Sequence, residues 1–332
     1  MKNKKILDRF LGCTFGGAVA DAFTFPYNGI FTKDLISSIS VDTKKYKKTK
    51  TGECGNFSLP TMSVIAVIKA IISKNKPDDM GTLAELKTMY LNEEHRGKLY
   101  ATIDAIKNAI DDKKWEEIPV KVGIADCSTA LRSAPIGLWN YDNKPKVIHE
   151  CSAEISKVTH KDYRATSAAI MAGSAISYLI NIKKKFSFDD FLKNIYNTVM
   201  LEDKETALLL KELPKIYKKK NPEIALLKLL KLGNISYSPY EYGGGISPFS
   251  LSVVFTALYV FTKNFNNFDK MMTDIVHISG EINALACIAG NFWGALNGYN
   301  ALPVELVDNL LDKEELYALT VKLFKLKHGI KE

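Results

Sequence analysis

Carboxylate, hydroxyl and amide side chains gather in four short segments of the sequence, and each segment could take part in binding or catalysis. In the first, Asp21 lies among small and apolar residues, where a buried carboxylate is stable only with hydrogen bonds or an ion pair. We interpret Asp21 either as a helix cap or buried ion pair, or as a ligand-binding residue.

The second segment runs from Gly55 to Met62 and predicts the start of a helix, because Ser58 is closely followed by Pro60. Backbone N–H groups at a helix N-terminus favour an anion such as phosphate. Ser58 and Thr61 are therefore candidate ligand-binding residues, although most helices begin this way without a ligand.

The third and fourth segments add a histidine and a second acid. Ser128 and His160 are candidate ligand-binding residues, although a lone histidine is more often a structural hydrogen-bonding group. Glu281 and Asn283 offer oxygens two positions apart at a predicted helix start. They could ligate a hard cation, but such a site needs several converging oxygens.

Stretches with helical periodicity separate these segments, so the sequence predicts an all-α fold of many helices. Strand signals are scarce: residues 120–122 and 36–41 could be extended, but neither has a hairpin partner. Nothing resembles a linker, which predicts one domain over residues 1–332. The predicted helices cover residues 62–73, 104–110, 165–180, 188–199, 224–232, 251–261, 268–278 and 285–296.

Glycines mark two further features. Residues 236–239 and the run Gly243, Gly244 and Gly245 predict a long polar loop, and we include the run among the candidate ligand-binding residues. Small residues recur every four positions in a late helix, which gives that helix one flat face. We expect another helix to pack against it at short distance. The small residues are Ala286, Gly290, Gly294 and Gly298.

The chain has 332 residues, 46% hydrophobic and 25% charged, which is ordinary for a soluble globular protein with a large core. Much of its formal net charge of +8 lies in short lysine runs, which are usually solvated. No nucleic-acid reader motif accompanies this charge, so we expect no nucleic-acid partner.

The five cysteines are widely spaced and form no CxxC pair, which argues against a zinc site or a disulfide framework and favours a reducing, cytoplasmic setting. At the N-terminus, Asp8 and Arg9 interrupt what would be the apolar part of a signal peptide. The most apolar stretch, residues 251–261, is too short to span a bilayer, so we expect no membrane association.

Together and in this order, the segments resemble the ADP-ribosylglycohydrolase family, which includes the glycohydrolase that reactivates dinitrogenase reductase. The resemblance covers residues 10–303. Residues 20–22 are similar to the family's Gly-Asp-Ala core, and residues 131–138 to its Met-Arg-x-x-Pro-Leu-Gly-Leu stretch. Thr159-His160 before an Ala-rich helix also fits, as does the late small-residue helix at residues 280–298.

The resemblance implies a magnesium-dependent hydrolase in active family members. Two ions are held by an Asp-Asp-Thr run, an Asp-Thr-Asp-Thr run and a glutamate after the opening helix. They orient the ribose and a water that splits ADP-ribose from its acceptor. Mg²⁺ prefers anionic oxygens in octahedral array, and a metal-bound water becomes a usable nucleophile.

This chain departs from the family at those positions. The first run reads Leu59-Pro60-Thr61, the second reads Glu281-Ile282-Asn283-Ala284, and Asn28 stands at the position of the glutamate. Asp126-Cys127-Ser128 replaces a Gly-Asn-Gly run. One strong anionic ligand remains where the family supplies about four, so we expect no cofactor. A residual single Mg²⁺ would bind Thr61, Glu281 and Asn283.

We therefore predict a catalytically degenerate family member. It would bind ADP-ribose, a related nucleotide or an ADP-ribosylated protein in the former active-site cleft. The candidate ligand-binding residues are Asp21, Asn28, Ser58, Thr61, Ser128, His160, Gly243, Gly244, Gly245 and Asn283.

Two alternatives remain open. One is an active ADP-ribosyl hydrolase with one metal ion or none, in which Glu281 is the catalytic residue. In that case a lost acid would be substituted by Glu53, Asp126 or Asp21. The other is a structural protein, since lens crystallins resemble the same family. Hydrocarbon would then fill the former metal space, from Phe57, Leu59 and Ile282.

Overall fold

The computed structural model is built from α-helices and describes residues 2–30, 39–49, 53–92, 96, 100–111, 113–234, 238 and 243–330. No strand forms within these residues, so the all-α prediction is confirmed. The possible extended piece at residues 36–41 and the polar loop at 236–239 lie partly outside the described residues.

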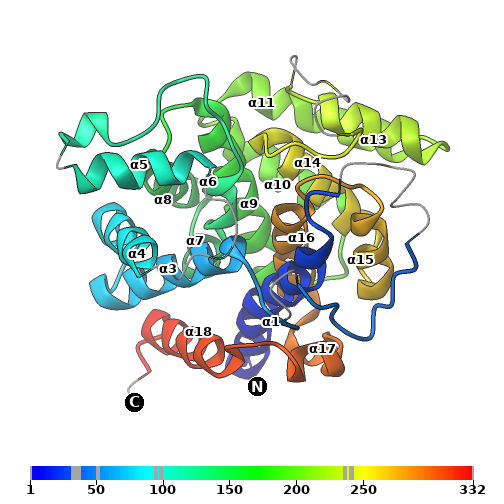
Figure 1. Ribbon diagram of the computed structural model, residues 1–332, viewed down its shortest axis with the longest axis horizontal. Helices are drawn as coiled ribbons and strands as arrows, with labels where there is room; N and C mark the ends of the chain where they lie inside the picture. The colour runs from blue at the N-terminus through cyan, green and yellow to red at the C-terminus, as the bar shows by residue number, and fades with distance from the viewer. Residues whose placement is uncertain are drawn as a thin grey trace.

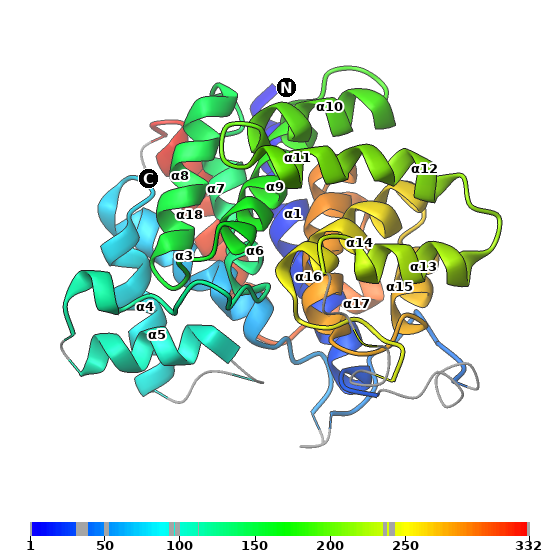
Figure 2. The ribbon, with the colours of Figure 1, turned by 90° about the horizontal axis from the view of Figure 1, so that it is seen from above.

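Two long helices, α1 (Lys2–Thr24) and α16 (Ile282–Asn297), run side by side through the middle of the molecule (Figures 1 and 2). A Cβ on Gly290 would lie 2.2 Å from the carbonyl oxygen of Gly16, and a Cβ on Gly294 would lie 1.7 Å from that of Gly12. The small-residue face therefore lets the two backbones touch, as the sequence predicted.

The remaining helices surround this pair. In Figure 1, α3, α4, α5 and α18 cover one side, and α13, α14 and α15 cover the other. The helices are α3 (Leu59–Lys74), α4 (Asp79–Leu91), α5 (Tyr100–Ile110), α6 (Ser128–Leu131), α7 (Ala134–Trp139), α8 (Pro145–Lys157), α9 (Tyr163–Asn181), α10 (Phe188–Val199), α11 (Lys204–Leu209), α12 (Leu213–Tyr217), α13 (Pro222–Lys231), α14 (Ser250–Lys263), α15 (Phe268–Val276), α17 (Val304–Asp308) and α18 (Lys313–Lys327).

Local sequence signals set the helix boundaries. α3 begins directly after Ser58 with Pro60 in its first turn, and it ends where Asn75 adopts a left-handed φ of 58°. Every predicted helix is present, and α10 has the predicted bounds. The predicted ranges did not include α4 and α18, because charged and polar residues interrupt their apolar spacing. They also omitted α8 and the short helices α6, α7, α11, α12 and α17.

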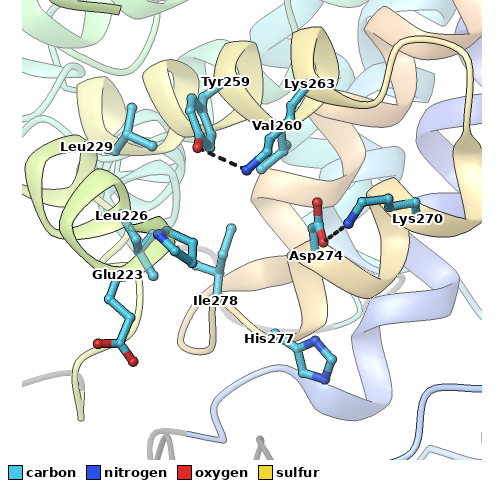
Figure 3. Close-up of a pocket in the computed structure, with 11 residues that line it drawn as sticks. Glu223, Leu226, Leu229, Tyr259, Val260, Lys263, Lys270, Asp274, His277 and Ile278 are labelled. Carbon is cyan, nitrogen blue, oxygen red and sulfur yellow. Dashed lines mark hydrogen bonds and ion pairs between the residues drawn. The ribbon is translucent and has the colours of Figure 1, made fainter. Parts of the chain in front are cut away.

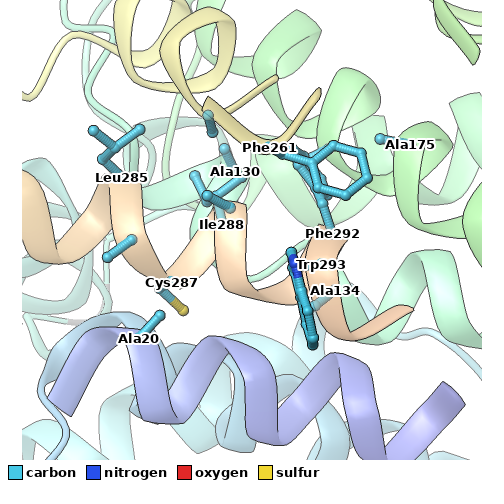
Figure 4. Close-up of a cluster of buried hydrophobic side chains, with 14 of the residues drawn as sticks. Ala20, Ala130, Ala134, Ala175, Phe261, Leu285, Cys287, Ile288, Phe292 and Trp293 are labelled. Carbon is cyan, nitrogen blue, oxygen red and sulfur yellow. The ribbon is translucent and has the colours of Figure 1, made fainter. Parts of the chain in front are cut away.

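The main hydrophobic cluster surrounds α16 (Figure 4). On this helix Ile288 and Phe292 point toward neighbouring helices, and Cys287 lies near Ala20 of α1. The rings of Phe261 and Phe292 pack edge to face at 5.8 Å between centroids. This packing fixes the start of α16 relative to the end of α1.

Among the described residues, no helix has the length and apolar character needed to cross a membrane.

Candidate functional site

The candidate site lies where α1 ends and α3, α6, α14 and α16 begin. Backbone hydrogen bonds join the loops between these helices. The Gly29 N–H donates to the Gly280 carbonyl at 3.0 Å, and the Cys127 N–H donates to the Pro248 carbonyl at 2.8 Å. Loops that are far apart in the sequence therefore meet at one place.

Asp21 is fully buried and binds the start of α3. Its Oδ2 accepts hydrogen bonds from the backbone N–H groups of Ser58 at 3.0 Å and Thr61 at 3.1 Å. The Ser58 hydroxyl donates to Oδ1 at 2.5 Å, and the Thr61 hydroxyl donates to Oδ2 at 2.7 Å. Burial raises the pKa of Asp21 to about 6, and the four hydrogen bonds oppose that rise. Asp21 thus occupies the anion position at this helix N-terminus, where a phosphate would otherwise fit.

A chain of side-chain hydrogen bonds continues from Ser58 to the start of α16. Asn283 Nδ2 donates to Ser58 Oγ at 2.9 Å, and the Asn283 N–H donates to Asn28 Oδ1 at 3.2 Å. Asn28 Nδ2 in turn donates to Glu281 Oε2 at 3.0 Å. Six of the residues selected from the sequence therefore form one connected network: Asp21, Asn28, Ser58, Thr61, Glu281 and Asn283.

The glycine run packs against the loop that precedes α16. A Cβ on Gly245 would lie 2.6 Å from the backbone nitrogen of Gly280. Gly243 and Gly244 are partly exposed and have positive φ angles of 53° and 81°. A side chain at position 245 would displace the loop that carries Glu281, so the close approach of the two backbones requires glycine there.

Asp126 forms a second polar cluster. Its Oδ1 accepts hydrogen bonds from the Ser128 N–H at 2.8 Å and from the Ser128 hydroxyl, and it lies 3.3 Å from His160 Nε2. Burial raises the pKa of Asp126, but His160 and Ser128 outweigh this effect and hold the pKa at about 2. Asp126 is therefore an ionised carboxylate at neutral pH, already engaged by Ser128 and His160.

The two clusters are neighbours. Burial raises the pKa of the Cys127 thiol, and the charges of Asp126 and Glu281 raise it further, which places both acids within electrostatic reach of one side chain. Of the candidate ligand-binding residues, Ser128 and His160 belong to the Asp126 cluster. The structure thus groups the selected polar residues into two clusters, one with Asp21 and Glu281 and one with Asp126, rather than around a single dense acidic centre.

Arg132 and Thr159 extend the second cluster and were not selected as site residues from the sequence. Arg132 is buried and donates from Nη2 to Thr159 Oγ1, which lies 2.8 Å from His160 Nδ1. Burial lowers the pKa of Arg132 to about 10, and the charge of Asp126 opposes that change. The sequence did contain a signal for this residue. Arg132 lies among small and apolar residues, which predicts burial, and a buried arginine needs hydrogen-bonding or charged partners.

The side chains of the first cluster do not fit a pair of magnesium ions. The Thr61 hydroxyl is committed to Asp21, and Asn283 Oδ1 accepts the Ala284 N–H at 2.9 Å. Over the described part of the chain, no group of three or more His, Cys, Asp or Glu side chains is placed to hold a metal ion. Glu281 is one partly exposed carboxylate beside two neutral amides, whereas Mg²⁺ requires several anionic oxygens.

The apolar residues at the positions that the resemblance matches to metal ligands pack into the core. Leu59 belongs to a cluster with Leu86 and Ile106, and Ile282 is fully buried in the main cluster. Glu53 is exposed and accepts a hydrogen bond from Asn56 Nδ2 at 2.5 Å, outside both polar clusters.

Comparison with known proteins agrees with this architecture. A family model described as ADP-ribosylglycohydrolase matches residues 2–331. The fold is similar to a solved structure described as an ADP-ribosylglycohydrolase-related protein complex, with a TM-score of 0.71 and 17% sequence identity over 98% of this chain and 99% of that chain. No curated protein matches the sequence. The family match therefore extends over nearly the whole chain.

Proposed function

Because this chain belongs to the ADP-ribosylglycohydrolase family, we propose that it uses the family's cleft for binding and lacks the two-magnesium chemistry of active members. The ligand is ADP-ribose, a related nucleotide, or an ADP-ribosyl group carried by a protein. The binding face is the one where α1 ends and α3 and α16 begin.

The contact between Asn28 and Glu281 carries this proposal. The resemblance places both at positions where active members have carboxylates. Two adjacent carboxylates repel each other unless a cation lies between them. Here the Asn28 amide donates a 3.0 Å hydrogen bond to the Glu281 carboxylate. The carboxylate therefore has a neutral hydrogen-bond donor as its partner instead of a cation. This pair of side chains attracts rather than repels, so it needs no metal ion to hold it together.

The partly exposed groups at this face suit a ribose joined to a phosphate. The Glu281 carboxylate can accept hydrogen bonds from the vicinal hydroxyls of a ribose. Gly243 and Gly244 have positive φ angles and no side chains, so their backbone N–H groups can approach phosphate oxygens. The N-terminus of α3 is not available to the phosphate, because Asp21 already occupies it.

Calorimetric titration tests the proposal. The full chain is titrated with ADP-ribose, NAD and AMP, each with and without Mg²⁺. We expect binding of ADP-ribose with the same affinity in both conditions. Absence of heat with all three ligands would reject the binding function, and binding that requires Mg²⁺ would reject the metal-independent site.

A hydrolase is the second candidate, and the Asp126 cluster favours it. An ionised carboxylate lies 3.3 Å from His160 Nε2, which is an arrangement that could support proton transfer. The signature of this activity is release of free ADP-ribose from an ADP-ribosylated protein, lost in Glu281→Ala. Absence of release from the native chain would remove this candidate.

A purely structural role has less support. In that reading hydrocarbon fills the former metal space, but Leu59 packs with Leu86 and Ile106, and Asn28 and Glu281 remain partly exposed.

All five cysteines are free thiols, which supports the proposal that the protein works in a reducing compartment such as the cytoplasm.

A further inference from the structure

A separate cleft lies between α13, α14 and α15 (Figure 3). Its volume is about 580 Å³, within the range of sites that hold small organic molecules. None of the residues that line it belongs to the two polar clusters described above. The cleft is therefore a different site from the candidate ADP-ribose site.

The walls of the cleft are mainly apolar. Leu229, Val260 and Ile278 are almost fully buried, and Leu226 and Tyr259 are partly exposed. They come from three helices or helix ends, so the shape of the cleft depends on tertiary packing. An apolar surface of this kind favours a hydrocarbon or aromatic part of a ligand.

The charged groups at the cleft include two lysines, Lys263 and Lys270, and two acids, Asp274 and Glu223, but only Asp274 forms an ion pair with one of these lysines. Lys263 donates to the Tyr259 hydroxyl at 3.3 Å, and it forms no ion pair with a carboxylate in the described part of the chain. Lys270 is paired with Asp274 at 2.9 Å, and Asn264 Nδ2 also donates to Asp274 at 2.9 Å. The acid facing the cleft is thus already neutralised, while the Lys263 ammonium is not.

The other two titratable groups of the cleft, Glu223 and His277, lie away from Lys263 (Figure 3). Figure 3 shows the Glu223 carboxylate directed away from Lys263 and Lys270, at the opposite edge of the cleft. His277 also lines the cleft and is exposed. A negative group placed near Lys263 would therefore meet a cation and a tyrosine hydroxyl without an opposing carboxylate.

We propose that this cleft binds an amphipathic monoanion: a medium-length hydrocarbon chain that ends in a carboxylate. The chain lies against Leu226, Leu229 and Ile278, and the carboxylate pairs with Lys263. The apolar walls provide most of the affinity, and the cation selects for a negatively charged head group.

Titration of the full chain with octanoate, 1-octanol and octylamine tests this inference. Octanoate should bind most tightly, because it combines the chain with the negative head group. Lys263→Met should weaken octanoate binding about tenfold and leave 1-octanol binding unchanged. Leu226→Trp should abolish binding of both, because the indole fills the cleft.

Lys211→Met is the matched control. Lys211 also lies over a tyrosine ring, that of Tyr196 at 5.1 Å, but it does not line the cleft. The inference is overturned if no ligand binds, if 1-octanol binds as tightly as octanoate, or if Lys211→Met weakens octanoate binding as much as Lys263→Met. Circular dichroism of each variant separates loss of binding from loss of folding.

Discussion

The side-chain amide of Asn28 donates a hydrogen bond of 3.0 Å to the carboxylate of Glu281, across 253 positions of the sequence. It joins the segment after α1 to the start of α16. A neutral donor thus stands where the family resemblance implies a second acid, and the proposal of a metal-independent binding site rests on this contact.

Replacing Asn28 by glutamate should make the protein respond to magnesium. The Asn28→Glu side chain would face the Glu281 carboxylate, and the repulsion should lower the melting temperature by several degrees, as a loss of about 1–2 kcal/mol does in a domain of this size. Millimolar Mg²⁺ should recover much of that loss by binding between the two acids.

Asn28→Ala is the control for this variant. It removes the hydrogen bond to Glu281 without adding a charge, so its melting temperature should fall slightly and should not depend on Mg²⁺. A melting temperature of the native chain that rises with Mg²⁺ would show that the unmodified site already binds the ion.

Glu281→Ala should weaken ADP-ribose binding by about tenfold, because the ribose hydroxyls lose a charged hydrogen-bond acceptor. Calorimetry measures the change. Glu314→Ala removes an exposed glutamate in the first turn of α18 and should leave the affinity unchanged. An unchanged affinity in Glu281→Ala would place the ligand elsewhere.

The Asp126 cluster should contribute to stability in a defined pH range. The folded pKa of Asp126, about 2, lies below the unfolded value of about 3.9. Its contribution is therefore fully present above pH 4 and is lost as the pH falls from about 4 to 2. The expected loss is about 2 kcal/mol.

Urea unfolding at several pH values measures this effect. The difference in stability between the native chain and Asp126→Asn should shrink as the pH falls through this range. Asp189→Asn, at an exposed position in α10, should show no such pH-dependent difference. A native-to-Asp126→Asn difference that stays constant from pH 5 to pH 2 would contradict the lowered pKa of Asp126.

Gly290→Ala should destabilise the fold by about 3 kcal/mol, because the new Cβ would lie 2.2 Å from the Gly16 carbonyl oxygen and force α1 and α16 apart. Gly329→Ala is the comparison: its backbone has a φ of 62°, but among the described residues nothing beyond its chain neighbours lies within 4 Å of the added Cβ. It should cost about 1 kcal/mol in urea unfolding. Equal costs would mean that the helix contact is looser than described.

Much of the fold follows from local patterns in the sequence. The apolar spacing of residues 188–199 and the Ser58-Pro60 signal led to correct helices, and the small residues of α16 correctly predicted a close helix contact. Helices with interrupted apolar spacing, such as α4, were missed because tertiary packing stabilises them more than local sequence does.

The sequence by itself determined the all-helical architecture and the family resemblance, and through that resemblance it predicts the loss of acids at positions 28, 59 and 60, since residue identity and periodicity are local properties. The tertiary structure alone decided what the remaining polar groups contact. Asp21 caps α3, and Glu281 binds Asn28, because the packing of α1 against both α3 and α16 brings these side chains within hydrogen-bonding distance. Such distances depend on contacts between residues far apart in the chain, which no local pattern encodes.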